Sequence, residues 1–377
     1  MSDRLDLRDA CAARAAWMTT TVAALARLES PSGDVPRLAA CADALTDLMR
    51  EIGADVERLP SPAGEHLRAT IGTGSRQILL LGHYDTVWGA GTVDRMPVEI
   101  VDGRLHGPGT FDMKAGLVIA LTAASLVRPQ LHDVRLRCLF TADEEVGSTT
   151  SRALIEAEAR DSAAVLVFEP ALPGGVLKTS RKGVGTFRLE ARGVPAHAGI
   201  APQDGASAVL EVARQVVALD ALAAPSLGTT VNTGVIAGGT RTNVVAEEAL
   251  IDIDVRVTAS AEQQRIESAW AALTPVDSRV RLTRSGSFER PPLERGPHVA
   301  QLFALAQRAG ASVGLDVREG STGGASDGNF TAALGVPTLD GLGAIGAGAH
   351  ARHEHVEIAS LPERAALAAA IILALDA

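Results

Sequence analysis

Five short segments of this 377-residue chain carry histidine or acidic side chains of the types that bind metal ions in hydrolases. In chain order, these side chains are His83 with Asp85, Asp112, Glu144 with Glu145, Glu169, and His350. Three of the segments follow apolar runs typical of buried strands, at 78–81, 139–140 and 165–168. Ligands of open α/β sheets gather outside the carboxyl ends of the strands, so we expect these side chains to meet at one sheet edge. Histidines and carboxylates converging there would suit two zinc ions and hydrolytic chemistry.

The spacing within the segments predicts separate tasks. His83 and Asp85 are two residues apart and face the same way on an extended segment, so Asp85 can hold one imidazole nitrogen while the other binds metal. Glu144 and Glu145 are adjacent, and adjacent side chains leaving a strand diverge. One of them can therefore bind metal while the other faces the attacking water as a general base.

Each segment taken alone has a plainer interpretation. Asp112, flanked by glycines ahead of an apolar helix, is typical of a helix N-cap. The acidic residues at 143–145 are equally typical of a solvated turn, and His83 of a strand-end histidine with a structural partner. His353 and His355 compete with His350 for the last position, and we favour His350 because glycines precede it. The ordered set therefore carries the prediction, rather than any single segment.

Composition and length limit the class of protein. The net charge is -10 and no basic patch offsets it, which argues against a nucleic-acid partner. No apolar run has the length of a membrane span, and the first residues lack an apolar signal core, so we expect a cytoplasmic protein without a membrane partner. The cysteines have no metal-type spacing and are expected to be reduced thiols, at Cys11, Cys41 and Cys138.

The elements that must position these residues fall into two patterns, and the chain is long enough for two domains. Up to Glu169, strand-like and helix-like segments alternate, which predicts an α/β fold with a mostly parallel sheet flanked by helices. Between 181 and 290 the order changes to βαββαβ, a ferredoxin-like α+β arrangement with one wet sheet face. We expect 1–180 and 291–377 to form one catalytic domain and 181–290 an inserted lid and dimerisation domain. The last helix is expected to begin with Ser360 as its N-cap.

From about Leu79 to the last helix, these motifs resemble the aminoacylase/carboxypeptidase family of dinuclear zinc hydrolases, most closely its glutamate carboxypeptidase branch. Further motifs that carry the resemblance are Ser180-Arg181-Lys182-Gly183, Ala196-His197-Ala198-Gly199, Asn243-Val244-Val245, Asp254-Val255-Arg256 and Gly324-Ala325-Ser326-Asp327-Gly328-Asn329. The resemblance implies two Zn²⁺ ions, replaceable by Co²⁺ or Mn²⁺. The implied ligands are His83 and Glu169 on one metal, Glu145 and His350 on the other, and Asp112 bridging both.

The resemblance also implies how the remaining residues act. Asp85 would orient His83, Glu144 would be the general base, and the peptide bond after Asp112 would be cis. In family dimers, a histidine matched by His197 reaches the partner's active site and stabilises the oxyanion. The substrate carboxylate would be held by Asn243 and Arg256, with Arg290 as a further candidate.

The activity that the resemblance implies is cleavage of an amide bond in a small peptide or N-acyl amino acid, which releases an amino acid with a free α-carboxylate. A glutamate carboxypeptidase and an N-acyl-amino-acid deacylase need the same metals and base, so both stay open. Glutamate at position 169 argues against an aminopeptidase, which tends to have aspartate there. A metal-free homologue that only binds ligands is the alternative from another class. The resemblance further implies a homodimer formed through the inserted domain.

Overall fold

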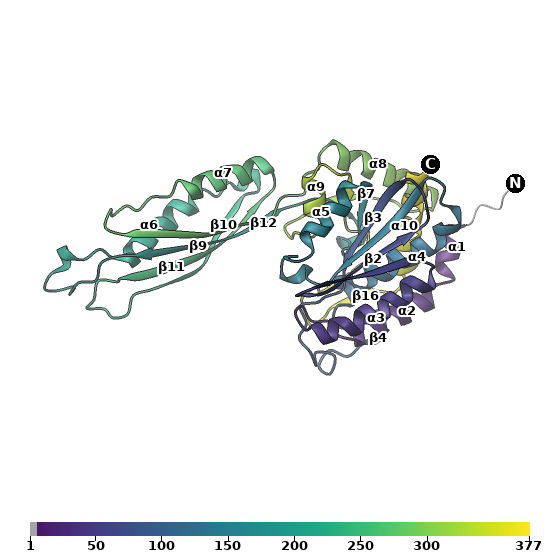
Figure 1. Ribbon diagram of the computed structural model, residues 1–377, viewed down its shortest axis with the longest axis horizontal. Coiled ribbons are helices and arrows are strands. Elements are labelled where there is room, and N and C mark those ends of the chain that lie inside the picture. The colour runs from purple at the N-terminus through teal and green to yellow at the C-terminus, as the bar shows by residue number, and fades with distance from the viewer. Residues whose placement is uncertain (1–5) are drawn as a thin grey trace. The chain divides into compact units, whose positions relative to one another are not determined.

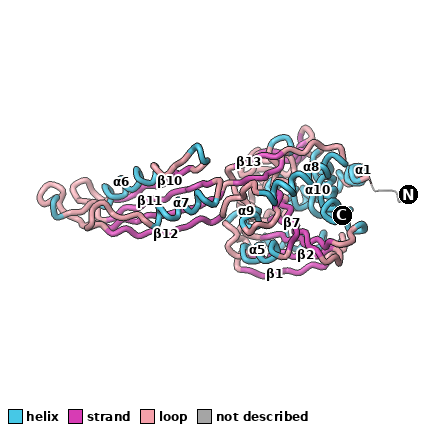
Figure 2. Tube along the Cα trace, turned by 90° about the horizontal axis from the view of Figure 1, so that it is seen from above, coloured by secondary structure: helices cyan, strands magenta, loops and turns pink. Residues whose placement is uncertain are grey.

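The computed structural model describes residues 6–377 (Figures 1 and 2). The chain forms two compact units. One contains the residues up to Ser180 together with Glu294–Ser321 and Ser326–Ala377, and the other contains Arg181–Leu293 with Thr322–Ala325. The second unit therefore interrupts the first in sequence.

The larger unit is built on a six-stranded sheet in the order β1-β2-β6-β3-β7-β14. Its strands are β1 (Asp55–Ser61), β2 (Gly64–Ile71), β3 (Arg76–His83), β6 (Val134–Thr141), β7 (Ser162–Val167) and β14 (Thr338–Leu339). The pairings of β3 with β6 and β7, and of β7 with β14, are parallel, whereas β1–β2 and β2–β6 are antiparallel. The predicted mostly parallel α/β sheet is thus confirmed in the strands that lead to the candidate site.

Helices cover both faces of this sheet (Figure 1). Alternate residues of β3 belong to two different cores, Ile78 and Leu80 to the larger and Leu79 and Leu81 to the smaller. The larger core is covered by α1 (Leu7–Ala12), α2 (Ala15–Arg27), α3 (Val35–Glu51), α4 (Ala115–Val127), α8 (Pro297–Ser312) and α10 (Ser360–Asp376). The smaller core is covered by α5 (Arg152–Arg160) and α9 (Gly328–Ala333). Because both faces are covered, the central strands are apolar on both sides.

Among the described residues, one helical stretch, Thr110–Gln130, has the length and hydropathy of a membrane span. Its most apolar window is 83% buried within the protein. This is the environment of a core helix, and its side chains pack with those of α2 and α10.

A small four-stranded sheet in the order β15-β16-β5-β4 was not predicted from the sequence. Its strands are β4 (Glu99–Val101), β5 (Arg104–His106), β15 (Gly346–Ala347) and β16 (His355–Glu357). The turn between β15 and β16 carries His350, and β5 leads directly into the loop that carries Asp112. A further two-stranded sheet pairs β8 (Leu177–Arg181) with β13 (Glu319–Thr322).

The smaller unit contains an antiparallel sheet in the order β10-β11-β9-β12, with α6 (Ala208–Asp220) and α7 (Ser260–Ala271). Its strands are β9 (Gly183–Arg192), β10 (Thr230–Gly238), β11 (Glu248–Val257) and β12 (Arg281–Arg290). The element order β9-α6-β10-β11-α7-β12 is βαββαβ. Apolar side chains of β9 and β11 alternate with charged ones and pack under the helices, so the opposite sheet face is polar.

Several element boundaries differ from those predicted. Ser360 is the first helical residue of α10 rather than its N-cap, and its hydroxyl bonds to the carbonyl oxygen of Glu357 instead of capping the helix. The residue pattern also predicts a helix beginning at 148 and a strand over 278–285. The helix, α5, begins instead at Arg152, and the strand, β12, spans Arg281–Arg290. Tertiary pairing lengthens that strand, because β9 offers partners along its whole length.

Candidate metal centre

Three neighbouring strands of the large sheet deliver candidate residues to one edge. The strands β6, β3 and β7 lie side by side and run parallel, so their carboxyl ends coincide. β3 ends at His83, and Glu169 follows β7 after one intervening residue. Glu144 and Glu145 follow β6 on a 3-10 turn, Glu144–Val146, rather than on the strand exit itself. The topology therefore brings these side chains to one place, as expected for the edge of an α/β sheet.

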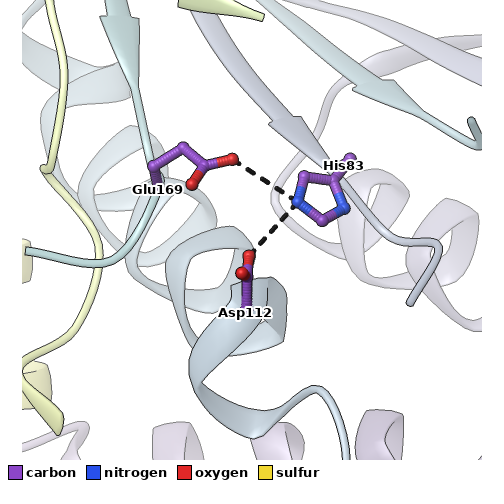
Figure 3. Close-up of side chains that lie close together, drawn as sticks. All are labelled: His83, Asp112 and Glu169. Carbon is purple, nitrogen blue, oxygen red and sulfur yellow. Dashed lines mark ion pairs between the residues drawn. The ribbon is translucent and has the colours of Figure 1, made fainter. Parts of the chain in front are cut away.

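His83, Asp112 and Glu169 form the first group of candidate ligands (Figure 3). His83 Nε2 lies 3.4 Å from Asp112 Oδ1 and 3.5 Å from Glu169 Oε1. All three side chains point toward one another from different elements, and the His83 side chain is buried. One nitrogen and two oxygens of three residues thus surround one small volume.

Asp112, Glu145 and His350 form the second group. His350 Nε2 lies 3.4 Å from Asp112 Oδ2 and 3.1 Å from Glu145 Oε2. Asp112 belongs to both groups, and a different oxygen atom of its carboxylate faces each histidine. This sharing is the geometry that a carboxylate bridging two metal ions requires.

Two buried polar atoms of the site have no hydrogen-bond partner among the described residues, namely His83 Nε2 and Asp112 Oδ1. Buried polar atoms are rarely left in this state, and a cation between the two would satisfy both. The whole ligand set contains three carboxylates and two imidazoles, so its negative charge exceeds what the histidines can offset. Histidine nitrogens and carboxylate oxygens are ligands suited to zinc and similar divalent ions, and the residues present therefore fit two such ions.

The pKa values of the four central groups reflect their proximity. Burial opposes charging of His83, but the surrounding carboxylates, Asp112 first, outweigh it and hold its pKa well above the usual value. The carboxylates of Asp112 and Glu145 raise the pKa of His350 to about 10. Burial also opposes ionisation of Asp112, yet His350 and His83 hold its pKa below the usual range. For Glu145 burial is the larger effect, and it raises the pKa. The site therefore attracts positive charge.

Asp85 connects His83 to the turn that carries Glu144 and Glu145. Its buried carboxylate lies 3.4 Å from His83 Nδ1, and His83 Nδ1 is 3.0 Å from the Asp85 backbone oxygen. The carboxylate also accepts hydrogen bonds from the backbone N–H groups of Glu144 and Glu145, at 3.1 and 3.2 Å. A fourth partner is the Ser32 hydroxyl, which donates at 2.6 Å. One side chain thus orients the imidazole and positions the turn of the two glutamates.

The loops carrying Asp112 and His350 adopt unusual backbone conformations. The peptide bond Asp112–Met113 is cis, and His350 has a φ of 60°. His353 and His355 are not part of either ligand group, and the His355 ring packs 5.2 Å from that of His106 instead. Among the three rival histidines, His350 is therefore the one brought to the site.

The four predicted substrate residues lie in the smaller unit, in two separate places. Ala198 N–H donates to Asn243 O at 3.0 Å, so His197 and Asn243 lie in adjoining loops. Arg256 and Arg290 both pair with Val184, on one rung of the sheet. These loops follow the other end of the sheet, where Glu248 pairs with Arg192. From Arg256 to Glu248 is eight residues of strand β11, about 26 Å at ~3.3 Å per residue.

Two residues near the metal centre were missed by the sequence analysis. Glu354 is a buried carboxylate that accepts backbone hydrogen bonds from the Asp112 loop, and burial raises its pKa to about 7. Ser32 anchors Asp85 as described above. Glu354 directly precedes β16, His355–Glu357, and a strand of three residues with one apolar side chain gives no periodic signal that would single out its neighbour.

The chain is similar to known hydrolases over most of its length. It is 29% identical to carboxypeptidase G2 of Pseudomonas sp. (strain RS-16) over 377 residues, covering 95% of this chain and 89% of the relative. It is also 29% identical to succinyl-diaminopimelate desuccinylase of Xanthomonas euvesicatoria pv. vesicatoria, covering 88% and 92% of the two chains. Its relatives thus include both a peptidase and a deacylase.

Solved structures share the fold. The aminopeptidase PepT of Bacillus cereus superposes with a TM-score of 0.77 at 22% identity, covering 95% of this chain and 98% of the other. The YXEP protein of Bacillus subtilis, described as a dinuclear metal binding peptidase, superposes with a TM-score of 0.68 at 15% identity, covering 97% and 99%. Residues 79–374 match the model of the peptidase family M20/M25/M40. Because this match spans most of the sequence, the chain belongs to that family and is a metallopeptidase or amidohydrolase.

Proposed function

We propose that the protein is a two-metal hydrolase that cleaves an amide bond and releases an amino acid with a free α-carboxylate, as a glutamate carboxypeptidase does. The observation that carries this proposal is the shared Asp112, whose two oxygens face His83 and His350 at 3.4 Å each. In this proposal His83 and Glu169 would hold one metal, Glu145 and His350 would hold the other, and Asp112 would be shared by both. Zinc is the expected metal, with cobalt or manganese as substitutes.

The bound metals would supply Lewis acidity toward the substrate carbonyl and the attacking water. Glu144 removes a proton from that water and returns it to the leaving nitrogen, which leaves as a neutral amine. The amide hydrogen bonds to Asp85 hold the Glu144 backbone, so the base acts from a fixed turn. Asp85 also keeps the His83 ring oriented through its Nδ1 side.

In this proposal the substrate carboxylate is held by the guanidinium of Arg256 and the Asn243 amide, with Arg290, which pairs with the other side of Val184, as a further candidate. Guanidinium groups match a carboxylate with two parallel donors. At present Arg256 is bonded to Asp254, at 2.8 to 3.1 Å, and that partner must yield when substrate binds. His197 Nδ1 accepts from the backbone N–H groups of Gly199 and Ile200, so in the neutral ring Nε2 carries the proton that can be donated to an oxyanion.

We also propose that two chains share each active site. Residues about 26 Å apart on one sheet cannot contact the same small substrate, whereas a dimer can combine His197 and Asn243 of one chain with Arg256 of the other. The edge strand β10 exposes Val235 and Ile236, at 47% and 59%, and the neighbouring helix α6 exposes Val217 at 72%. An edge strand with exposed apolar residues favours pairing with a second copy.

Deacylation of an N-acyl amino acid is the second candidate, and it is favoured by the equal identity to a desuccinylase. A panel of peptides with C-terminal glutamate and of N-acyl amino acids, assayed with added Zn²⁺, separates the two. We expect the highest kcat/KM on a substrate that releases glutamate or a similar acidic amino acid. Preference for succinyl or acetyl diamino acids would instead establish the deacylase. Full turnover after thorough chelation, with metal content measured, would contradict both.

A further inference from the structure

Glu354 is a fully buried carboxylate whose side chain faces the loop of Asp112. Its Oε1 atom accepts hydrogen bonds from the backbone N–H groups of Phe111 and Asp112, at 2.9 and 3.0 Å. Its Oε2 atom accepts from the Gly109 N–H at 3.0 Å and from the Trp88 indole N–H at 2.7 Å. Each oxygen therefore has two donors, which fills the acceptor capacity of an ionised carboxylate.

The same residue is attached to the turn of His350. The Glu354 N–H donates to Ala351 O at 2.9 Å, and the Glu354 O atom accepts from the Gly107 N–H at 3.4 Å. β16 begins at the next residue and pairs with β5, which leads into the Asp112 loop. Glu354 thus joins the two chain segments that carry Asp112 and His350, two of the three ligands of the second group.

This arrangement excludes two simpler roles for Glu354. With four donors on its oxygens, it has no free position for a metal, and it belongs to neither ligand group. Within residues 6–377 no lysine or arginine side chain forms an ion pair with it, so it is not one half of a buried salt bridge. Burying the Glu354 carboxylate with only N–H donors around it is energetically costly. In return, the carboxylate fixes the orientation of three backbone N–H groups of the Asp112 turn.

We propose that Glu354 is a positioning residue of the metal centre, which sets the backbone of Asp112 so that one carboxylate oxygen faces His83 and the other faces His350. The inference rests on the proposed function, because orientation of Asp112 matters most if its carboxylate bridges two metals. Groups that hold metal ligands in place typically change metal affinity by ~10–100-fold when they are removed.

The test is Glu354→Gln in the full chain. Glutamine keeps the volume, but its NH₂ group faces two of the four donors, so the Asp112 turn loses at least one of the three backbone hydrogen bonds that Glu354 accepts from it. We expect Zn²⁺ affinity, measured by competition with a chelator, to fall ~10–100-fold. We also expect a changed absorption spectrum of the Co²⁺-loaded protein and a lower kcat with KM little altered. Wild-type affinity and an unchanged spectrum would overturn the inference.

Glu158→Gln is the matched control. Glu158 is also a buried carboxylate of the larger unit, bonded to Arg68, Gln77 and Arg137, but Gln77 lies at the amino end of β3, away from His83. We expect this variant to lose stability yet keep wild-type metal affinity and spectrum. An equal loss of affinity in Glu158→Gln would show a general effect of instability and overturn the inference.

Trp88→Phe is the second variant, for the case that Glu354→Gln does not fold. It removes one donor to Glu354 and leaves the three backbone donors in place. We expect a smaller loss of metal affinity with the same change in the Co²⁺ spectrum, and wild-type values would again overturn the inference. A wild-type chain that binds fewer than two metals would instead overturn the proposed function itself, which separates the two failures.

Discussion

Glu144 and Glu145 are neighbours on one turn, and Glu145 contacts a candidate ligand, with Oε2 3.1 Å from His350 Nε2. Both backbone N–H groups are held by the same carboxylate of Asp85, so the different tasks proposed for the two residues must come from side-chain direction rather than from separate loops. This difference can be tested one residue at a time.

We expect Glu144→Gln to keep both metals and lose ~10²–10⁴-fold in kcat, because the amide cannot accept the proton of the attacking water. Glu145→Gln should lose metal as well as activity, because an amide is a poorer ligand than a carboxylate. Metal content per chain, measured beside kcat for each variant, checks both. Glu51→Gln, an exposed position on α3, serves as the control. Near-normal turnover of Glu144→Gln would show that another group is the base.

At the scale of the element, the last residue of the core helix α10, Asp376, forms hydrogen bonds to the start of a sheet strand. Asp376 accepts hydrogen bonds from the backbone N–H groups of His132, Asp133 and Val134, at 2.8 to 2.9 Å. Val134 is the first residue of β6, the strand that leads to the turn of Glu144 and Glu145. A negative charge at a helix carboxyl end is unfavourable, so these bonds must account for any stabilising effect of Asp376.

We expect Asp376→Asn to lower the free energy of unfolding at pH 7 by about 1 kcal/mol. Burial opposes ionisation of Asp376, but the three backbone N–H groups overcome it and lower its pKa. A carboxylate whose pKa is lowered by folding stabilises above its unfolded pKa of ~3.9, and this contribution disappears as the pH falls through the folded pKa. Urea unfolding at pH 7 and at progressively lower pH should therefore show the difference from wild type shrinking. Asp316→Asn, at a side chain that is 90% exposed, should show no comparable difference at either pH.

At the scale of the whole molecule, the smaller unit carries two groups of substrate candidates at opposite ends of one sheet. If each site is completed by a second chain, two different inactive variants should complement each other. We expect heterodimers of His197→Ala and Glu144→Gln chains, purified through two tags, to recover up to about half of the wild-type activity per dimer. The homodimers of either variant alone should be inactive. Absence of any recovery in verified heterodimers would place His197 in the site of its own chain, or outside it.

The sequence by itself determined the larger features of the fold and the residues of the candidate centre. Apolar runs that end at Leu81, two residues before His83, and at Phe168, directly before Glu169, predicted neighbouring strands whose carboxyl ends coincide, because parallel strands connected by helices share one direction. Alternating polarity predicted the antiparallel sheet of the smaller unit, since one face is covered by helices and the other is polar. These signals are local in the chain, because each is carried by consecutive or alternating residues of one strand.

The tertiary structure alone decided how the loops between these elements meet. The strands β5, β15 and β16 have two or three residues each, which is too short for a periodic signal, yet they bring the loops of Asp112 and His350 together. The hydrogen bonds of the Glu354 carboxylate also depend on this packing, because their donors lie at 88 and 109–112, more than 240 residues earlier in the chain. The separation of His197 from Arg256 likewise depends on strand register. Contacts between distant segments are set by packing and pairing, and no local pattern of residues records them.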